Sequence, residues 1–223
     1  MAKHILVVSA HPDDETLGCG GTLLKHIAAG DRVDWLIATD GWEPLMSRAW
    51  LDEREKQISL VQAAYGLNET FRLGFRAAML SSTPIGEVVA KVRDVVARSM
   101  PDIVYTVFPG DVHDDHRVVF DAVHAAAKPF RGGRDIKALF AYETPSSTNM
   151  APPFSHRAFL PQVFSDITPF LPRKIEIFRI FASEIQAVPG PRSEEAITAL
   201  ARWRGSAVGM DFAESFMTIR QIL

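Results

Sequence analysis

The chain has 223 residues, of which 47% are hydrophobic and 23% charged, and a net charge of −3, which is typical of one globular domain, here residues 1–223. A single cysteine, Cys19, excludes an internal disulfide and a cysteine-rich zinc site, and the small net charge gives no reason to expect a nucleic-acid partner. No apolar run reaches the roughly 18 residues that span a bilayer, so we expect a soluble cytoplasmic protein without membrane insertion.

The first predicted element is a strand over residues 5–8, whose β-branched side chains suit a buried parallel strand. A polar block follows, with His11, Asp13 and Asp14, and then a helix to about Ile27. In open α/β sheets, ligands bind at the carboxyl ends of strands. A histidine and two carboxylates are costly to bring together there unless they bind something, and a metal ion is the simplest candidate.

Strands and helices alternate along the rest of the chain. The predicted strands cover residues 32–39, 71–73, 103–108, 138–142 and 164–167, and the predicted helices cover 51–65, 85–98, 117–127, 172–186, 193–204 and 213–222. This alternation favours an α/β fold with a parallel sheet and helices on both faces. A proline- and serine-rich loop over residues 143–154 is long enough to cover a site.

A second polar cluster follows the strand at residues 103–108 and contains His113, Asp115 and His116. Zinc hydrolases use three His or Asp/Glu ligands and leave one position for water, whose pKa falls to about 7. The reaction also needs a carboxylate base and a donor for the developing oxyanion. The two clusters together contain all of these parts, although spacing alone does not assign the roles.

Single features of these clusters also have plain structural interpretations. Asp13 or Asp14 alone could be the N-cap of the following helix. Gly18 and its neighbouring glycines suit close packing of that helix on the sheet, and we expect Asp111 and Asp114 to lie in solvent on their turn. Two clusters of metal-ligating residues, each at a strand end, favour the metal interpretation.

The HPDDE motif after the first strand, with HDDH about a hundred residues later, resembles the LmbE-like, or PIG-L, de-N-acetylase family. This resemblance implies a Rossmann-like three-layer sandwich with a mostly parallel sheet. It also implies a zinc-dependent hydrolase that removes acetyl groups from N-acetylglucosamine-type sugars, and it allows a homo-oligomer. We expect one Zn²⁺ per chain, and the same His/Asp set accommodates Fe²⁺ or Co²⁺.

Position by position in the two motifs, the resemblance implies a zinc-ligand set of His11, Asp14 and His116. Asp13 matches the general base of the family. His113 matches the histidine that, when protonated, stabilises the tetrahedral oxyanion, and Asp115 matches the carboxylate that orients this histidine. A base beside a ligand carboxylate can reach an adjacent water, so the chemistry agrees with this division.

Three further residues are candidates for substrate contact. Trp42 and Tyr142 stand at predicted strand ends, although packing explains Trp42 equally well, and Arg54 matches an arginine of the family. The chain departs from the family pattern at Gln57, where Glu is common, and at residues 181–184. These departures indicate a branch that acts on another acetylated amino sugar, nucleotide-linked or in a glycan precursor.

The sequence thus predicts an N-deacetylase that releases acetate from an N-acetylated amino sugar or its conjugate. One alternative is an amidase of the same family that cleaves a larger acyl group or a thiol conjugate. An alternative of another class is a non-catalytic sugar- or nucleotide-binding protein with a structural metal. That protein would lack the base or the oxyanion histidine, whereas Asp13 and His113 are both present.

Overall fold

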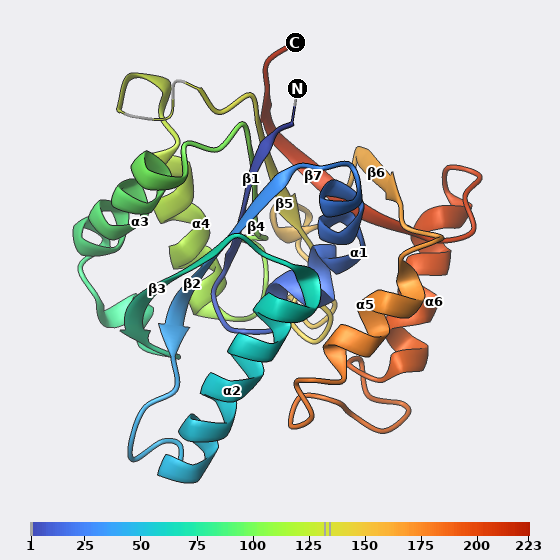
Figure 1. Ribbon diagram of the computed structural model, residues 1–223, viewed down its shortest axis with the longest axis horizontal. Coiled ribbons are helices and arrows are strands. Elements are labelled where there is room, and N and C mark those ends of the chain that lie inside the picture. The colour runs from blue at the N-terminus through green and yellow to red at the C-terminus, as the bar shows by residue number, and fades with distance from the viewer. Residues whose placement is uncertain (1, 132, 134) are drawn as a thin grey trace.

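The computed structural model describes residues 2–131, 133 and 135–223, and its strands and helices alternate as expected (Figure 1). The strands are β1 (His4–Ser9), β2 (Arg32–Asp40), β3 (Glu69–Arg76), β4 (Ile103–Val107), β5 (Ala138–Tyr142), β6 (Val163–Asp166) and β7 (Ala213–Gln221). The α-helices are α1 (Asp14–Ala28), α2 (Arg48–Tyr65), α3 (Ile85–Ser99), α4 (Asp114–Ala126), α5 (Leu171–Phe178) and α6 (Glu194–Ser206).

All seven strands form one mixed sheet in the order β3-β2-β1-β4-β5-β7-β6. Strands β1 to β5 run parallel, and β7 pairs antiparallel with both β5 and β6. In this order β1 lies between β2 and β4. After β1 the chain adds β2 and β3 on one side of β1, and it then crosses over to add β4 and β5 on the other side. Such a reversal point opens a crevice at the carboxyl ends of the two central strands, where α/β proteins bind ligands.

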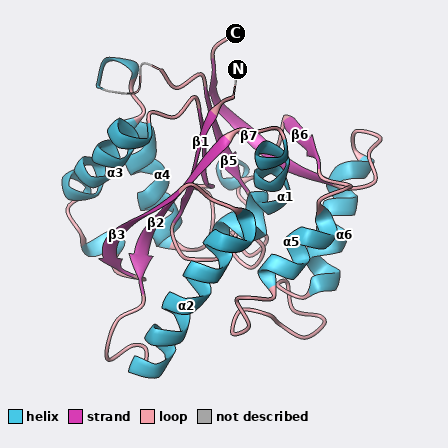
Figure 2. Ribbon diagram, in the orientation of Figure 1, coloured by secondary structure: helices cyan, strands magenta, loops and turns pink. Residues whose placement is uncertain are grey.

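Helices cover both faces of the sheet, which makes the fold a three-layer sandwich (Figures 1 and 2). Helices α3 and α4 pack against each other on one face, and α1, α2 and α5 pack together on the other. The central strands are buried between the two layers, with β1 fully buried from Ile5 to Ser9. Helix α1 lies so close to the sheet that a Cβ atom on Gly18 would stand 2.1 Å from the Tyr142 ring, which confirms close packing at this glycine.

The predicted helix over residues 213–222 is wrong, because this segment is strand β7. Its first half buries two polar residues, Glu214 and Ser215, and its apolar residues Ala213, Phe216 and Met217 follow the i, i+3, i+4 spacing of a helix. Apolar spacing therefore indicates a helix here, although the segment pairs as a strand. The helix predicted over residues 172–186 also ends earlier, at Phe178. Within the described residues, no helix is long and apolar enough to cross a membrane.

Candidate metal and active site

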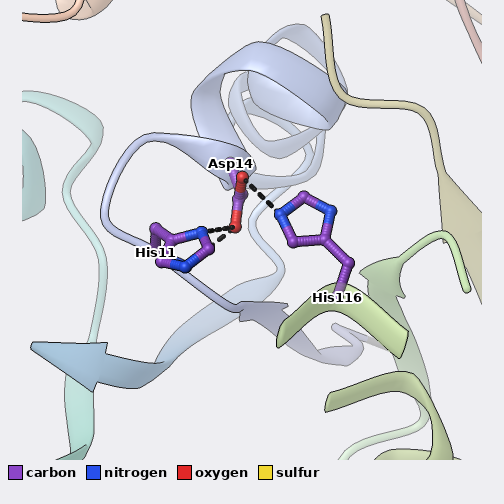
Figure 3. A group of neighbouring side chains, drawn as sticks. All are labelled: His11, Asp14 and His116. Carbon is purple, nitrogen blue, oxygen red and sulfur yellow. Dashed lines mark hydrogen bonds and ion pairs between the residues drawn. The ribbon is translucent and has the colours of Figure 1, made fainter. Parts of the chain in front are cut away.

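The two polar clusters meet at the carboxyl ends of β1 and β4, which are neighbours in the sheet. His11 belongs to the turn from β1 into α1, Asp14 is the first residue of α1, and His116 lies in the first turn of α4. Figure 3 shows the two imidazole rings facing the Asp14 carboxylate from different sides. One Asp14 oxygen stands 3.7 Å from His11 Nδ1 and the other stands 3.4 Å from His116 Nε2.

A carboxylate contacts the second nitrogen of each of these histidines. His11 Nε2 lies 3.0 Å from Asp115, and His116 Nδ1 lies 2.6 Å from Asp111. Metal-ligating histidines usually have such a partner, which fixes the tautomer and turns the other nitrogen toward the ion. The solvent position expected for Asp111 is therefore wrong, because this residue is buried with 4% of its surface exposed.

The charges around this group follow from burial and from its close pairs. Burial acts to raise the pKa of Asp14, but His116 and His11 hold it well below its usual range. Burial acts to lower the pKa of His116, but the carboxylates of Asp14 and Asp111 raise it to about 10. A metal ligand must be the neutral imidazole, so a cation bound to His116 would displace this proton.

The donor set suits a divalent metal ion. The ligand atoms of His11, Asp14 and His116 all lie within 4.8 Å of one another, and two imidazoles with one carboxylate make a typical catalytic set. His11, His113 and Asp115 form a second group, whose ligand atoms also lie within 4.8 Å of one another. The first group fits a metal better, because the Asp115 carboxylate already accepts the backbone N–H groups of Ala78 and Leu80.

Asp13 stands beside Asp14 in an unusual backbone conformation. Its φ is 135°, a region that residues other than glycine rarely adopt and that is most common at functional sites. Its backbone N–H donates to the buried Glu15 carboxylate at 3.1 Å, and its Oδ2 accepts from Arg192 Nη1 at 3.0 Å. Burial raises the pKa of Asp13 to about 7, against the opposing charge of Arg192.

His113 lies at the N-cap of α4, with its ring 4.4 Å from the ring of His11. Its Nδ1 accepts the backbone N–H of Asp115 at 3.2 Å, which leaves Nε2 to carry the ring proton. Burial, followed by the charges of His11 and His116, lowers the pKa of His113 to about 4. The Asp115 carboxylate contacts His11 and not His113, so the orienting role expected for it stays a prediction.

A hollow of about 250 Å³ opens beside these residues, and its lining includes His11, Asp13 and His113. Arg54 also lines this hollow, and its guanidinium donates to the Pro12 carbonyl at 3.0 Å. His11, Asp13 and His113 therefore face a space in which a small substrate can lie, whereas Asp14, Asp115 and His116 are buried outside its lining.

The other two predicted substrate contacts lie elsewhere. The Trp42 indole donates to the Ala77 carbonyl at 3.1 Å and supports the segment that donates to Asp115. Tyr142 is fully buried, and its hydroxyl donates to the Val8 carbonyl at 2.8 Å. We correct the expectation for Tyr142, because this ring packs in the core between the sheet and α1.

The structure adds site residues that the sequence reasoning did not assign. Arg192 and Glu184 line the same hollow, and Arg192 also donates to Ser146 in the loop over residues 143–154. The signal for Arg192 was weak, since it follows a Pro-Gly-Pro break that resembles any surface turn. For Asp111, the available signal was its place five residues before His116, on the same turn.

Fold and site together define a Rossmann-like α/β protein with a His/Asp centre of the kind that holds a divalent metal. The chain belongs to the PIG-L family, whose model, described as GlcNAc-PI de-N-acetylase, matches residues 6–127. This range includes both polar clusters. The family makes the chain an enzyme that hydrolyses N-acetyl amides, as the resemblance implied.

Individual relatives agree with the family. The chain is 28% identical over 170 residues to the uncharacterized deacetylase YaiS of Escherichia coli, which covers 74% of this chain and 82% of that protein. It is 25% identical over 193 residues to a probable N-acetyl-alpha-D-glucosaminyl L-malate deacetylase 2 of Bacillus anthracis. This match covers 82% of this chain and 81% of that protein. The crystal structure of the conserved protein TT1542 from Thermus thermophilus is similar with a TM-score of 0.79 and 28% identity, covering 99% of this chain and 96% of that one.

Proposed function

We propose that the protein is a zinc-dependent deacetylase that releases acetate from an N-acetylated amino sugar or its conjugate. The meeting of a His/Asp metal group, the further carboxylate of Asp13 and a histidine donor beside one hollow carries this proposal. We assign His11, Asp14 and His116 as the metal ligands. We assign Asp13, His113 and Asp115 to the chemistry.

The metal, when bound, supplies Lewis acidity that lowers the pKa of a water molecule and polarises the amide carbonyl. Asp13 accepts the proton of the attacking water as its oxygen bonds to the carbonyl carbon. The same carboxyl group then gives this proton to the nitrogen as the C–N bond breaks, so the products are acetate and a free amine. A base is most efficient with a pKa near the working pH, and burial gives Asp13 a pKa of about 7.

His113 lines the hollow and has one ring N–H group that can donate a hydrogen bond. Its Nδ1 is occupied by the Asp115 backbone N–H, so its Nε2 donates a hydrogen bond to the carbonyl oxygen as negative charge develops there. The resemblance implied a protonated His113, but burial lowers the pKa of this ring to about 4, so we propose that the neutral ring fills the role with its one N–H group. Asp115 acts through its backbone on His113 and through its carboxylate on His11, so it fixes both rings at once.

The substrate class rests on the relatives. The Bacillus anthracis relative is named for a malate conjugate of N-acetylglucosamine, and the family model for a phosphatidylinositol conjugate. We therefore propose a conjugate of N-acetylglucosamine or of a closely similar amino sugar, with Arg54 among its contacts. The deacetylases among the relatives favour deacetylation over cleavage of a larger acyl group.

Acetate release tests this function. The panel comprises N-acetylglucosamine, UDP-N-acetylglucosamine, and the inositol and malate conjugates of N-acetylglucosamine. Each compound is assayed with zinc-loaded protein, in the absence and in the presence of a chelator. We expect at least one conjugate to release acetate in a chelator-sensitive manner. Activity on a longer acyl amide in place of all of these would favour the amidase alternative, and metal-loaded protein that binds a conjugate without turnover would favour the binding protein.

A second experiment separates the two overlapping metal groups. We expect His116→Ala to abolish tight zinc binding, because His116 belongs only to the group with Asp14. His113→Ala should retain zinc and lose turnover. Zinc titration against a competing chelator measures both variants, and loss of zinc from His113→Ala alone would contradict our ligand assignment.

Other expectations from the sequence stay predictions. We propose that residues 1–223 act as one domain, supported by a sheet whose strands extend from His4 to Gln221. The identity of the metal, the cytoplasmic location and the homo-oligomer are likewise predictions. Measured metal content of purified protein, and its mass in solution, address the first and the last.

A further inference from the structure

Three charged residues meet at the turn that carries Asp13, one from α2 and two from the segment after α5. Glu184 pairs through one carboxylate oxygen with Arg54 Nη2 and accepts from Arg192 Nη1 through the other at 2.7 Å. We name Arg54, Glu184 and Arg192 the Arg–Glu–Arg bracket. Arg54 donates to the Pro12 carbonyl at 3.0 Å, and Arg192 donates to Asp13 at 3.0 Å, so both arms of the bracket hold the same turn.

We propose that Arg192 is a positioning residue, which holds the Asp13 carboxylate in the orientation needed for proton transfer, and that Glu184 holds Arg192 in place. This inference rests on the proposed function, because it concerns the base of that reaction. It concerns residues outside the part of the chain that the family model matches, since Glu184 and Arg192 both follow residue 127.

Burial makes the bracket effective. The side chains are 7% exposed for Arg54, 22% for Glu184 and 19% for Arg192, and Asp13 is 4% exposed. Charge-assisted hydrogen bonds are stronger and more directional than neutral ones, and low exposure limits screening by water. Each arginine is also fixed by a further contact, Arg192 through its Nε to Ser146 and Arg54 by stacking on Trp50.

The backbone at Asp13 needs such support. A φ of 135° is unfavourable for a residue with a side chain and persists only when surrounding contacts determine it. The Glu15 carboxylate holds the Asp13 N–H, and Arg192 holds the other end of the residue through Oδ2. A proton acceptor misplaced by about 1 Å can lose on the order of a hundredfold in rate, so this second restraint has a functional consequence.

The two oxygens of Asp13 differ in their surroundings. Oδ2 accepts from Arg192, whereas no residue in the described part of the chain donates to Oδ1. Asp13 lines the hollow with 4% of its side chain exposed, and Oδ1 is the oxygen that Arg192 does not contact. The arrangement fixes one oxygen and leaves the other open to accept a proton.

The test uses zinc-loaded protein with Arg192→Met, Arg192→Lys and Glu184→Gln. The substrate is the malate conjugate of N-acetylglucosamine, or another panel member if the wild type hydrolyses it faster. We expect Arg192→Met to lower kcat by about 10- to 100-fold with KM within about threefold, and Arg192→Lys to recover part of that loss. Zinc content should stay at the wild-type level, because Arg192 contacts none of the assigned ligands.

Arg179→Met is the matched control. Arg179 forms an exposed pair with Glu194 in the same third of the chain and contacts no site residue. A kcat for Arg192→Met equal to that of the control would overturn the proposal. The proposal would also be overturned if Arg192→Met lost zinc and thermal stability together with kcat, and if Arg192→Lys recovered none of these. That result would indicate a purely structural role. An inactive, zinc-loaded wild type would instead reject the proposed function, and the role of Arg192 with it.

Discussion

At the scale of single residues, Asp13 is the group on which the proposed reaction depends most. Asp13→Asn keeps the size of the side chain but removes the proton acceptor. We expect kcat to fall by about 10² to 10⁴-fold, the usual contribution of a positioned base. Zinc content should not change, because the assigned ligands are other residues. Steady-state acetate release and metal analysis on the same preparation measure both, and an active Asp13→Asn enzyme would move the base to another residue.

Asp111 provides a second prediction at this scale. Its carboxylate accepts from His116 Nδ1, so it sets the tautomer and direction of a proposed ligand without touching the metal itself. Asp111→Asn should weaken zinc affinity by about 10- to 100-fold, as second-sphere changes usually do. Asp114→Asn is the matched control, because Asp114 is exposed on the same turn and pairs with Arg117. Competition titration with a chelator compares the two, and equal affinities would remove Asp111 from the metal site.

The sequence predicted that some of these residues lie close together, but it did not predict the position of others. His11, Asp14, His113 and His116 were predicted as a group because metal chemistry restricts residue types, and the ends of parallel strands bring them together. Arg192 depends on tertiary contacts across 179 residues of chain, which no local pattern encodes. Tyr142 was misplaced because a strand-end position does not tell whether a ring turns toward the site or the core.

At the scale of elements, helix α1 and strand β7 depend on each other. Helix α1 has a kink at Cys19, whose φ of −142° and ψ of 16° are not helical. Such a break removes intrahelical partners from the N–H groups that follow. Glu214 of β7 accepts the N–H groups of Gly21 and Thr22 at 2.8 and 2.7 Å, and Lys174 of α5 pairs with it at 2.7 Å. The carboxylate thus joins three elements.

Glu214→Gln should therefore destabilise the protein strongly. It leaves the Lys174 ammonium buried without its opposite charge, and removal of one partner of a buried pair costs about 3 to 5 kcal/mol. For a chain of this size we expect a decrease in Tm on the order of 10 °C. Glu194→Gln, which breaks the exposed pair with Arg179, is the control and should leave Tm unchanged. Thermal unfolding of both variants tests the prediction, and similar Tm values would show that the buried pair contributes little.

The pairing of β7 explains why this segment was predicted to be a helix. Residues 213–217 alone do not differ from a short helix, because the buried polar residues Glu214 and Ser215 are adjacent and interrupt the alternation that identifies a strand. The pairing partners of β7 lie more than forty residues earlier, on β5 and β6. The parallel strands were easier to predict, since each is a local run followed by its own helix.

At the scale of the whole molecule, the strand order puts the site where it is. Strands β1 and β4 are separated by more than ninety residues in sequence yet pair directly, with Ile5 opposite Ile103. Each is followed by a turn and a helix whose first residues carry the polar clusters. The family model covers this half of the fold, and the later half adds the Arg–Glu–Arg bracket and the strand that supports α1. The sequence showed the alternation but not this order.

Stability of the whole protein should fall in mild acid because of a histidine far from the metal site. His26, near the end of α1, contacts Asp31 at 2.7 Å and the Tyr105 hydroxyl at 3.0 Å. Burial lowers the pKa of His26 from 6.5 in spite of Asp31. As the pH falls through 6.5, the unfolded chain therefore binds the proton more readily than the folded protein. The contribution of His26 to the free energy of unfolding is therefore present in full above pH 6.5. It is lost as the pH falls from 6.5 to the lower pKa that His26 has in the folded protein.

We expect the free energy of unfolding of the wild type to decrease below pH 6.5 more steeply than that of His26→Gln. The difference in slope is limited to one proton, or about 1.4 kcal/mol per pH unit. His124→Gln, which removes an exposed histidine of α4, is the matched control, and both comparisons share any effect of acid on the metal ligands. Urea unfolding at pH 5, 6 and 7 measures the three proteins. Parallel pH profiles for the wild type and His26→Gln would show that His26 titrates alike in the folded and unfolded chains.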